Sequence, residues 1–373
     1  MIEMADKKLK VGNVPPLRFP EFEGEWEKKR LGGIGDVKMC RRVFNNETSP
    51  TGDIPFFKIG SFGKVADAFI SKELYLDYKN RFSFPKQGDI LISAAGTIGR
   101  TVVYDGEDAY FQDSNIVWIE NDNKMITNNF LYYIFQIVKY NTEGGTIQRL
   151  YNNILKSTKF NAPSITEQNK IASFLSLIDE RISTQNKIIE QYETLIKGLC
   201  FKLILQQNPN RKLKDCVECN SSSLTESEVK ERSGIYPVYG ANGIISFIND
   251  FQINGEAILM IKDGAGVGQV QFSSDKFSVI GTLNYLIAKS NINLKYIFFS
   301  LKFFNFDKYK VGSGIPHIYF KDYGESFIFC PSIVEQQNIE KILSYVEDKI
   351  LIEKMILQKY VLQKNHLLQQ LFI

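Results

Sequence analysis

The most constraining feature of this sequence is a segment that occurs twice. Residues 166–203 align without a gap with residues 334–371, and both copies follow the same motif, Pro-Ser-Ile-x-Glu-Gln, at residues 163–168 and 331–336. Within each copy, apolar residues step alternately by four and three positions, which is the a/d pattern of a heptad helix. The sequence therefore predicts two half-molecules, each ending in a long amphipathic helix with a coiled-coil seam.

A long helix with a narrow apolar stripe buries that stripe against a partner, and the obvious partner of each copy is the other copy. Gln185 and Glu353 interrupt the seam. A parallel pair would place Gln185 opposite Glu353, whereas an antiparallel pair with flush ends would place Gln185 opposite Tyr360 and Glu353 opposite Tyr192. We favour the antiparallel pair, because each buried polar side chain then has a phenol hydroxyl to bond.

The flush register also places Lys364 opposite Ile178, and it departs from ideal symmetry because the first copy has Ile196 where the second has Lys364. Each helix would be roughly 57 Å long at about 1.5 Å per residue. Two interpretations stay open: a packed helical hairpin, or a rigid ruler that holds two domains a set distance apart.

Composition restricts the class of protein. The chain has 373 residues, with 44% hydrophobic and 23% charged residues, which is typical of a globular protein of two or three domains. A net charge of +3 gives only weak support to nucleic-acid binding. We expect no signal peptide and no membrane span, since no apolar run approaches about 20 residues. One CxxC pair, Cys216 and Cys219, lacks a second pair or a nearby histidine, so we expect reduced thiols, no metal site and a cytoplasmic protein.

Short strands and turns fill the rest of each half, with one helix expected at residues 128–140 and another at residues 294–304. The predicted fold class is α+β, with two pseudo-repeated globular α/β domains separated by two long helices that form an antiparallel coiled coil. The expected divisions are a partly disordered lead-in at 1–20, a first globular domain at 21–162, a central long helix at 163–205, a second globular domain at 206–330 and a C-terminal long helix at 331–373.

No catalytic constellation is evident. The two histidines, His317 and His366, are too few and too far apart for a metalloprotease motif or a conventional triad. There is no phosphate-binding GxxxxGK[ST] loop, and the glycines of residues 264–268 do not follow GxGxxG. The Asn/Asp-Pro-Pro-aromatic motif of aminomethyltransferases is also missing. We therefore expect a non-catalytic chain without a cofactor of its own.

Polar and basic side chains near the turns of both halves are candidates for contact with DNA. Arginine and lysine can bind guanine edges or phosphates, and glutamine and asparagine can bind adenine. The candidates are Lys58, Arg81, Ser93, Thr97, Arg100, Gln148 and Arg149 in the first half, and Tyr239, Asn242, Lys262, Gln269, Asn284, Lys310 and His317 in the second.

These motifs together resemble the specificity subunit of a type I restriction-modification enzyme. The residues that carry the resemblance are Leu17-Arg18-Phe19-Pro20-Glu21-Phe22-Glu23-Gly24-Glu25-Trp26, the repeated Pro-Ser-Ile-x-Glu-Gln, Gly88-Asp89-Ile90-Leu91 with residues 96–99, residues 239–243, and Gly312-Ser313-Gly314-Ile315-Pro316-His317. They cover essentially the whole chain in the family's order.

The resemblance implies two target recognition domains, each reading one half of a bipartite site in double-stranded DNA, and a coiled coil whose length sets the unread spacer. It also implies two modification subunits that carry S-adenosylmethionine and the adenine-N6 methylation chemistry. Two restriction subunits would supply ATP- and Mg-dependent translocation and cleavage. A coiled-coil scaffold that does not act on DNA is the alternative, and the chain is too short to include a fused methyltransferase domain.

Overall fold

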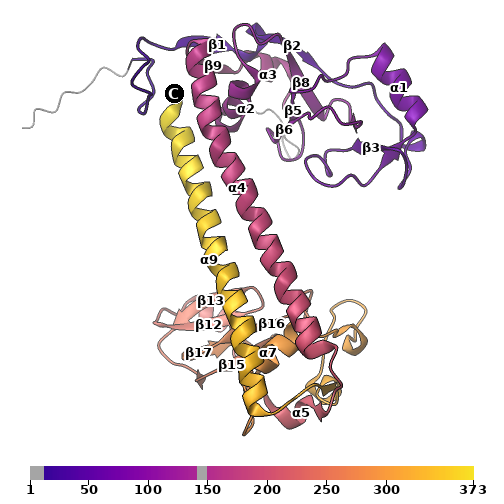
Figure 1. The fold of residues 1–373 in the computed structure, drawn as a ribbon, viewed down its shortest axis with the longest axis vertical. Helices are drawn as coiled ribbons and strands as arrows, with labels where there is room; N and C mark the ends of the chain where they lie inside the picture. Colours follow the sequence, from indigo (N-terminus) through magenta and orange to yellow (C-terminus); the bar gives the residue numbers. More distant parts are fainter. Residues whose placement is uncertain (1–11, 141–148) are drawn as a thin grey trace, which may run out of the picture. The chain divides into compact units, whose positions relative to one another are not determined.

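The computed structural model describes residues 12–140 and 149–373 and divides into two units (Figure 1). Unit 1 comprises the described residues up to 183 together with residues 358–373. Unit 2 comprises residues 184–357. The long helices α4 (Ile165–Cys200) and α9 (Ile333–Leu371) therefore contribute to both units. Throughout the described residues, no helix is both long and apolar enough to cross a membrane.

In unit 1, one antiparallel sheet has the strand order β2-β8-β5-β6, beside a smaller sheet of order β4-β3-β7 and the pair β1-β9. Trp26, Phe130 and Leu175 belong to one core cluster, and Phe56 and Tyr110 belong to a second cluster between the sheets. The elements are β1 Glu27–Arg30, η1 Leu31–Gly33, β2 Gly35–Lys38, η2 Asn45–Glu47, β3 Ile54–Phe57, β4 Phe69–Ile70, α1 Lys72–Arg81, β5 Ile90–Ser93, β6 Thr101–Val103, β7 Tyr110–Phe111, β8 Ile116–Asn121, α2 Asn128–Ile137, α3 Asn152–Ser157 and β9 Lys159–Ala162.

Unit 2 repeats this plan, with a sheet of order β11-β18-β15-β16, a second of order β13-β12-β17-β14 and the pair β10-β19. The elements are β10 Arg211–Lys212, α5 Leu213–Cys216, β11 Val217–Ser221, α6 Glu226–Lys230, β12 Tyr236–Gly240, β13 Gly243–Ile248, β14 Ile253–Asn254, β15 Ala257–Ile261, β16 Val270–Ser273, β17 Lys276–Val279, β18 Leu283–Ala288, α7 Leu294–Lys302, η4 Asp307–Tyr309, α8 Phe320–Tyr323 and β19 Phe327–Ile328. The predicted α+β class with pseudo-repeated domains is confirmed.

The predicted domain boundaries fall close to element ends. β9 ends at Ala162, the π-helical turn η3 (Phe201–Leu205) follows α4, and α9 begins at Ile333. A division by contacts assigns parts of both long helices to each unit instead of treating the helices as separate bodies. The boundaries at residues 162, 205 and 330 therefore stay a prediction.

The repeated glutamine of Pro-Ser-Ile-x-Glu-Gln fixes each long helix to its globular domain. Gln168 accepts a hydrogen bond from the backbone N–H of Thr127 at 3.0 Å, and Thr127 is the N-cap of α2. Gln336 accepts one from the backbone N–H of Asn293 at 2.9 Å, and Asn293 is the N-cap of α7. Both glutamines are buried, so the same joint satisfies an otherwise unpaired N–H at a helix start in each unit.

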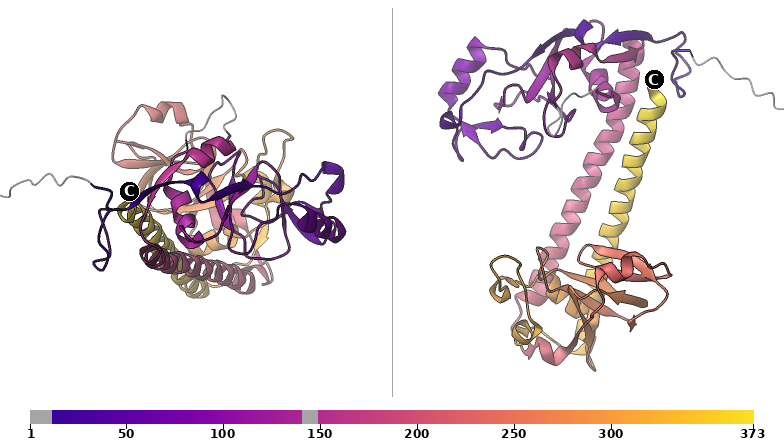
Figure 2. Two further views of the ribbon diagram at one scale, coloured as in Figure 1. Left: turned by 90° about the horizontal axis from the view of Figure 1, so that it is seen from above. Right: turned by 180° about the vertical axis from the view of Figure 1, so that it is seen from behind.

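In both units the segments of α4 and α9 lie side by side and run antiparallel, in every view (Figures 1 and 2). In unit 1, Leu175 of α4 packs with Leu367 and Leu371 of α9. In unit 2, Ile196 packs with Leu343. The predicted antiparallel pairing is confirmed.

The predicted flush register was wrong. Gln185 does not meet Tyr360; its amide donates to the carboxylate of Glu353 and, at 3.2 Å, to the backbone carbonyl of Glu353, one heptad away from Tyr360. The two polar seam residues thus satisfy each other. A hydrogen bond to an ionised carboxylate is stronger than one to a neutral phenol, which favours this pairing over the one with Tyr360.

Lys364 was expected opposite Ile178, and its side chain reaches the next residue of α4, Asp179. Its ammonium lies 2.6 Å from Asp179 Oδ1 and over the ring of Tyr133, at 5.8 Å from the ring centroid. The hydroxyl of Tyr133 donates to Asp179 Oδ2 at 2.9 Å, and burial of this phenol together with that hydrogen bond raises the pKa of Tyr133. A small ionic network therefore neutralises the one lysine of the predicted seam.

Candidate nucleic-acid interface

In unit 1, the turn after β5 pairs with the segment that follows residue 148. Ala95 and Arg149 form an antiparallel bridge, and the backbone N–H of Leu150 donates to the carbonyl of Ala94 at 2.9 Å. Gly96 and Gly99 both have positive φ, which this tight turn requires and which glycine adopts without strain. The pairing brings Thr97, Arg100 and Arg149 together at the end of the sheet.

Arg100 and Arg149 are held in place by different contacts. The Arg100 guanidinium donates to the carbonyl of Phe62 at 3.0 Å, and the Arg149 guanidinium donates to Asn115 Oδ1 at 3.1 Å. Each still has further N–H donors free for a ligand. Thr97 and Arg149 are exposed, while Arg100 is half-buried.

The loop that follows β3 lies against the same turn. A Cβ placed on Gly96 would lie 3.5 Å from Ile59 Cγ1, and Lys58 in this loop forms an ion pair with Asp67 at 3.5 Å. The exposed Lys64 lies in the same loop and is a further candidate, which the sequence did not single out. A lysine that lies several residues away from the glycine motifs cannot be recognised from the sequence as a candidate for DNA contact.

Ser93 does not belong to the exposed set. It is only 1% exposed, its hydroxyl donates to the carbonyl of Thr97 and accepts the backbone N–H of Arg100 at 2.8 Å. The side chain therefore shapes the turn and has no path to a DNA base in this conformation.

Arg81, another predicted residue of the first half, is not part of this cluster. Arg81 lies at the end of α1, where it pairs with Asp77 at 3.0 Å and stacks on Phe82. The ring of Phe82 also contacts Arg41, so a second basic site lies on this part of unit 1. Gln148 lies outside the described residues.

Unit 2 repeats the same turn-to-loop pairing with different side chains. Asp263 and His317 form an antiparallel bridge, and the backbone N–H of Ile318 donates to the carbonyl of Lys262 at 3.0 Å. The imidazole Nδ1 of His317 lies 2.6 Å from Asp263 Oδ1. Lys310 directly precedes Val311, which forms a second bridge with His317. Lys262, Lys310 and His317 are thus brought together.

The other candidates of the second half divide by burial. Gln269 and Asn242 are exposed, and Tyr239 is half-buried with its ring edge on Phe277 at 5.7 Å. Asn284, by contrast, is only 7% exposed on β18, so its side chain is buried. Alternation of residues along a strand predicts which face a side chain takes but not how deeply that face is covered.

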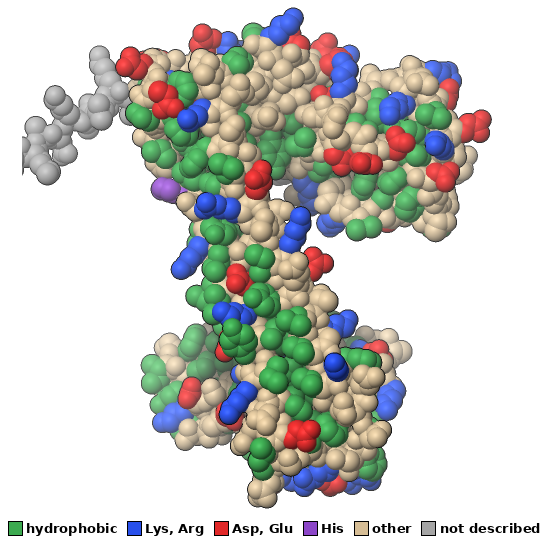
Figure 3. All heavy atoms as spheres, in the orientation of Figure 1, with side chains coloured by type: hydrophobic (Ala, Val, Ile, Leu, Met, Phe, Trp, Pro, Cys, Tyr) green, Lys and Arg blue, Asp and Glu red, His purple; other side chains and the backbone are tan. Residues whose placement is uncertain are grey.

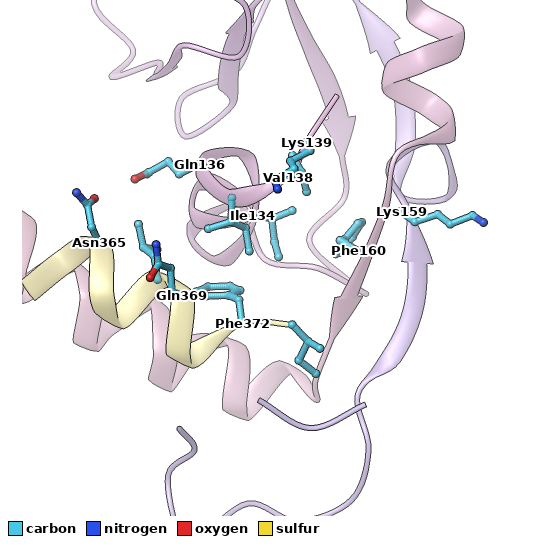
Figure 4. A pocket seen from close by; sticks show the side chains of 12 residues that line it. Ile134, Gln136, Val138, Lys139, Lys159, Phe160, Asn365, Gln369 and Phe372 are labelled. Carbon is cyan, nitrogen blue, oxygen red and sulfur yellow. The ribbon is translucent and has the colours of Figure 1, made fainter. Parts of the chain in front are cut away.

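One cavity and two of the buried cysteines lack the features of a catalytic site. A cavity of about 670 Å³ in unit 1 is lined by Gln136, Lys139, Phe160, Asn365 and Phe372 among others (Figure 4). Its described lining includes amides and lysines but no Asp, Glu, His or Cys side chain. Burial raises the pKa of Cys40 and of Cys200 to about 12, so these thiols stay protonated and unreactive. Among the described residues, no cluster of His, Cys, Asp and Glu could hold a metal ion.

Comparison with known proteins decides the family. The model of the type I restriction modification DNA specificity domain matches twice, at residues 23–194 and 207–360, which covers most of the chain. The chain belongs to this family. The resemblance read from the repeated motif and the turns is therefore confirmed, and each match of the specificity domain covers one of the two turn-to-loop pairings described above.

Relatives of this specificity-domain chain are themselves assigned as specificity subunits. A Haemophilus influenzae type I restriction enzyme specificity subunit is 54% identical over 48% of the chain. One of Methanocaldococcus jannaschii is 28% identical over 50% of the chain. These matches span 44% and 43% of those relatives, less than half of each. A Mycoplasma pneumoniae relative is 24% identical over 91% of the chain and 93% of its own length.

Solved structures support the fold of this specificity-domain chain. The crystal structure of the S subunit of a type I restriction-modification system from M. genitalium matches with a TM-score of 0.64 and 20% identity, over 96% of this chain and 99% of that one. A second structure, solved to describe assembly and conformational transition of the type I R-M system, matches with a TM-score of 0.52 and 15% identity, over 93% and 96% of the two chains.

Proposed function

We propose that this chain is the DNA sequence-specificity subunit of a type I restriction-modification complex. Each unit reads one half of a bipartite site, the long helices set the spacer, and the chain itself is not catalytic. The observation that carries the proposal is the duplicated turn-to-loop pairing, at Ala95–Arg149 in unit 1 and at Asp263–His317 in unit 2. The same backbone geometry presents different side chains, as two readers of different half-sites require.

The exposed or half-buried side chains at these pairings have the chemistry of DNA readout. In unit 1 they are Lys58, Lys64, Thr97, Arg100 and Arg149, and in unit 2 they are Lys262, Gln269, Lys310 and His317. Guanidinium groups can bind guanine O6 and N7 in the major groove, a glutamine amide can bind adenine, and lysines can neutralise phosphates. The buried Ser93 and Asn284 are left out of this set.

The helices are proposed to set the spacer because their heptad pattern and their pairing are those of a coiled coil. α4 and α9 both run uninterrupted for many turns, and the polar pair Gln185–Glu353 fixes their register in unit 2. Inserting four residues into both helices would lengthen the spacer and leave both half-sites unchanged. An altered half-site would contradict this role.

The remaining activities are proposed to reside on partner subunits. Two modification subunits would bring S-adenosylmethionine for adenine-N6 methylation, and two restriction subunits would use ATP and Mg for translocation and cleavage. The α9 segment of unit 2 presents large apolar side chains to solvent, which supports docking of a modification subunit there (Figure 3). These residues are Tyr345, Leu351, Ile352 and Met355, each about half exposed or more.

The experiment is to co-express the chain with its modification subunit and map N6-methyladenine in the host genome. We expect a split motif with a fixed gap that disappears when this chain is omitted. Methylation that does not depend on the chain would reject the specificity role in favour of a scaffold. The motif then supplies a duplex for binding assays, in which Arg149→Ala should weaken binding by about 10- to 100-fold, or roughly 1–3 kcal/mol, while Arg232→Ala, an exposed arginine outside both pairings, should not.

A further inference from the structure

The glutamate of the repeated Pro-Ser-Ile-x-Glu-Gln motif has very different surroundings in the two units. Glu167 is 1% exposed, and its carboxylate receives the Arg18 guanidinium at 2.8 and 2.7 Å and the Trp26 indole N–H at 3.3 Å. Glu335 is exposed, and within residues 12–140 and 149–373 its carboxylate has no hydrogen bond or ion pair. The same motif thus holds a completed ion pair in one unit and a free carboxylate in the other.

In unit 1 the partner of this helix face is an extended segment of the chain itself, residues 12–26, which we call the lead-in. Three residues of α4 at positions i, i+3 and i+7 share one face, and each contacts the lead-in. Beyond the Glu167–Arg18 pair, Lys170 forms an ion pair with Glu21 at 3.3 Å. The rings of Phe174 and Phe19 meet edge to face at 5.7 Å.

The corresponding face of α9 in unit 2 is open. The counterparts of Glu167, Lys170 and Phe174 are Glu335, Asn338 and Ile342, and all three are exposed. Ile342 is 48% exposed, although its counterpart Phe174 packs against the lead-in. A carboxylate and a large apolar side chain therefore stand on one helix face with nothing bound to them among the described residues.

Unit 2 closes its interior without a lead-in. Residues 206–210, which precede β10, include no arginine and no aromatic residue. The side chain of Asn210 bonds the backbone of Cys330 in both directions, at 3.2 and 2.8 Å. The hydroxyl of Tyr296 donates to the carbonyl of Phe329 at 2.8 Å. These hydrogen bonds connect residues 329–330, just before α9, to the rest of the domain, but they do not cover the face of α9 that carries Glu335.

We infer that the α9 face formed by Glu335, Asn338 and Ile342 binds an extended segment of a partner protein that carries an arginine next to an aromatic residue. The face keeps the carboxylate and a large apolar side chain at the two positions that hold Arg18 and Phe19 on α4. A guanidinium binds a carboxylate through two parallel hydrogen bonds, as Arg18 does to Glu167. Because Asn338 replaces Lys170, the partner segment needs no counterpart of Glu21. The inference concerns a protein surface and does not depend on DNA recognition.

The test uses the full chain and a labelled peptide with the sequence of residues 12–26 as the probe. We expect saturable binding by fluorescence anisotropy, weakened about tenfold or more by Glu335→Ala in the protein or by Arg18→Ala in the peptide. Glu231→Ala, an exposed glutamate elsewhere in unit 2, is the matched control and should leave binding unchanged. A Glu21→Ala peptide should bind as well as the parent, because Asn338 offers it no ion pair.

Two results would overturn the inference. One is the absence of peptide binding. Binding that Glu335→Ala does not weaken counts equally against the inference, because the peptide would then be replacing the lead-in of unit 1. The other is self-association that is lost on Glu335→Ala, which would make a second copy of this chain the occupant. A photo-crosslinking residue at position 342 in the chain co-expressed with its partner subunits should label an arginine-containing segment of one of those subunits.

Discussion

The buried ion pair between Arg18 and Glu167 supplies a sharp test of how the lead-in stabilises unit 1. The side chains are 14% and 2% exposed, and the carboxylate has three donors, two from Arg18 and one from Trp26. Removing one partner of a buried pair costs about 3–5 kcal/mol, because the other charge is left without compensation. Arg18 also donates to the carbonyls of Gly24 and Glu23 and lies nearer to solvent, so Glu167→Ala should fall at the lower end, about 3 kcal/mol.

The substitution Arg18→Ala should cost more than Glu167→Ala. It leaves the carboxylate of Glu167 buried with a single indole N–H, whereas Glu167→Ala leaves a guanidinium that can turn towards water. The matched control is Glu335→Ala, which alters the same motif position in unit 2 but removes no contact within the described residues, and which should change stability by less than about 0.5 kcal/mol.

The assay follows from the positions of the tryptophans. Both tryptophans of the chain, Trp26 and Trp118, lie in unit 1, so their fluorescence reports unfolding of that unit alone. With an m-value of about 2 kcal/mol per M urea, a loss of about 3 kcal/mol lowers the urea midpoint by roughly 1.5 M. A loss below about 1 kcal/mol for Glu167→Ala, or an equal loss for Glu335→Ala measured by circular dichroism, would refute the reasoning.

Three further substitutions test other parts of the fold. Gln185→Leu alone should destabilise unit 2 by about 1–2 kcal/mol because Glu353 loses its donor, while the double change with Glu353→Leu should be close to neutral, as read by thermal melts in circular dichroism. Lys364→Met should lower the stability of unit 1 by about 1–2 kcal/mol through loss of its pair with Asp179, as read by tryptophan fluorescence. Burial raises the pKa of Asp89 in the folded protein, so protonation of this carboxyl stabilises unit 1. That stabilisation is fully present below the unfolded-state pKa of 3.8 and is lost as pH rises through the folded-state pKa. Asp89→Asn should therefore be more stable than the parent at pH 7, and the difference in stability should vanish below pH 3.8.

The long helices could be predicted from the sequence because their signal is periodic and repeated. The heptad pattern located both helices. Their antiparallel direction was also predicted correctly, although the Gln185–Tyr360 pair on which that choice rested does not form. The same pattern could not fix the register, since a shift by one heptad leaves every apolar position in the seam. The choice rested on a Gln185–Tyr360 pair, whereas the carboxylate of Glu353 is the stronger acceptor and lies opposite Gln185.

The candidate interface was predicted only in part. Glycine turns mark where the chain reverses, and this located Thr97, Arg100 and His317 near the two pairings. The burial of individual side chains could not be predicted from the turns, so Ser93 and Asn284 were included although both are buried. Helix α2 was also expected to run to residue 140, but it ends at Ile137 because Val138 adopts an extended conformation. No propensity signal in an aromatic-rich helix specifies that end.

The internal repeat separates what the fold needs from what each unit is free to change. Gln168 and Gln336 make the same bond to the N-cap of a domain helix, so the joint between globular domain and long helix is the same in both halves. The side chains at the turn-to-loop pairings differ, since nothing in the joint constrains them. The glutamate next to this glutamine occurs in both copies of the motif, as the glutamine does. Its contacts differ between the units, because among the described residues only Glu167 has a partner for its carboxylate. A carboxylate retained on an exposed helix face contributes little to the stability of its own unit, and this is why its role in unit 2 is best sought in a contact with another chain.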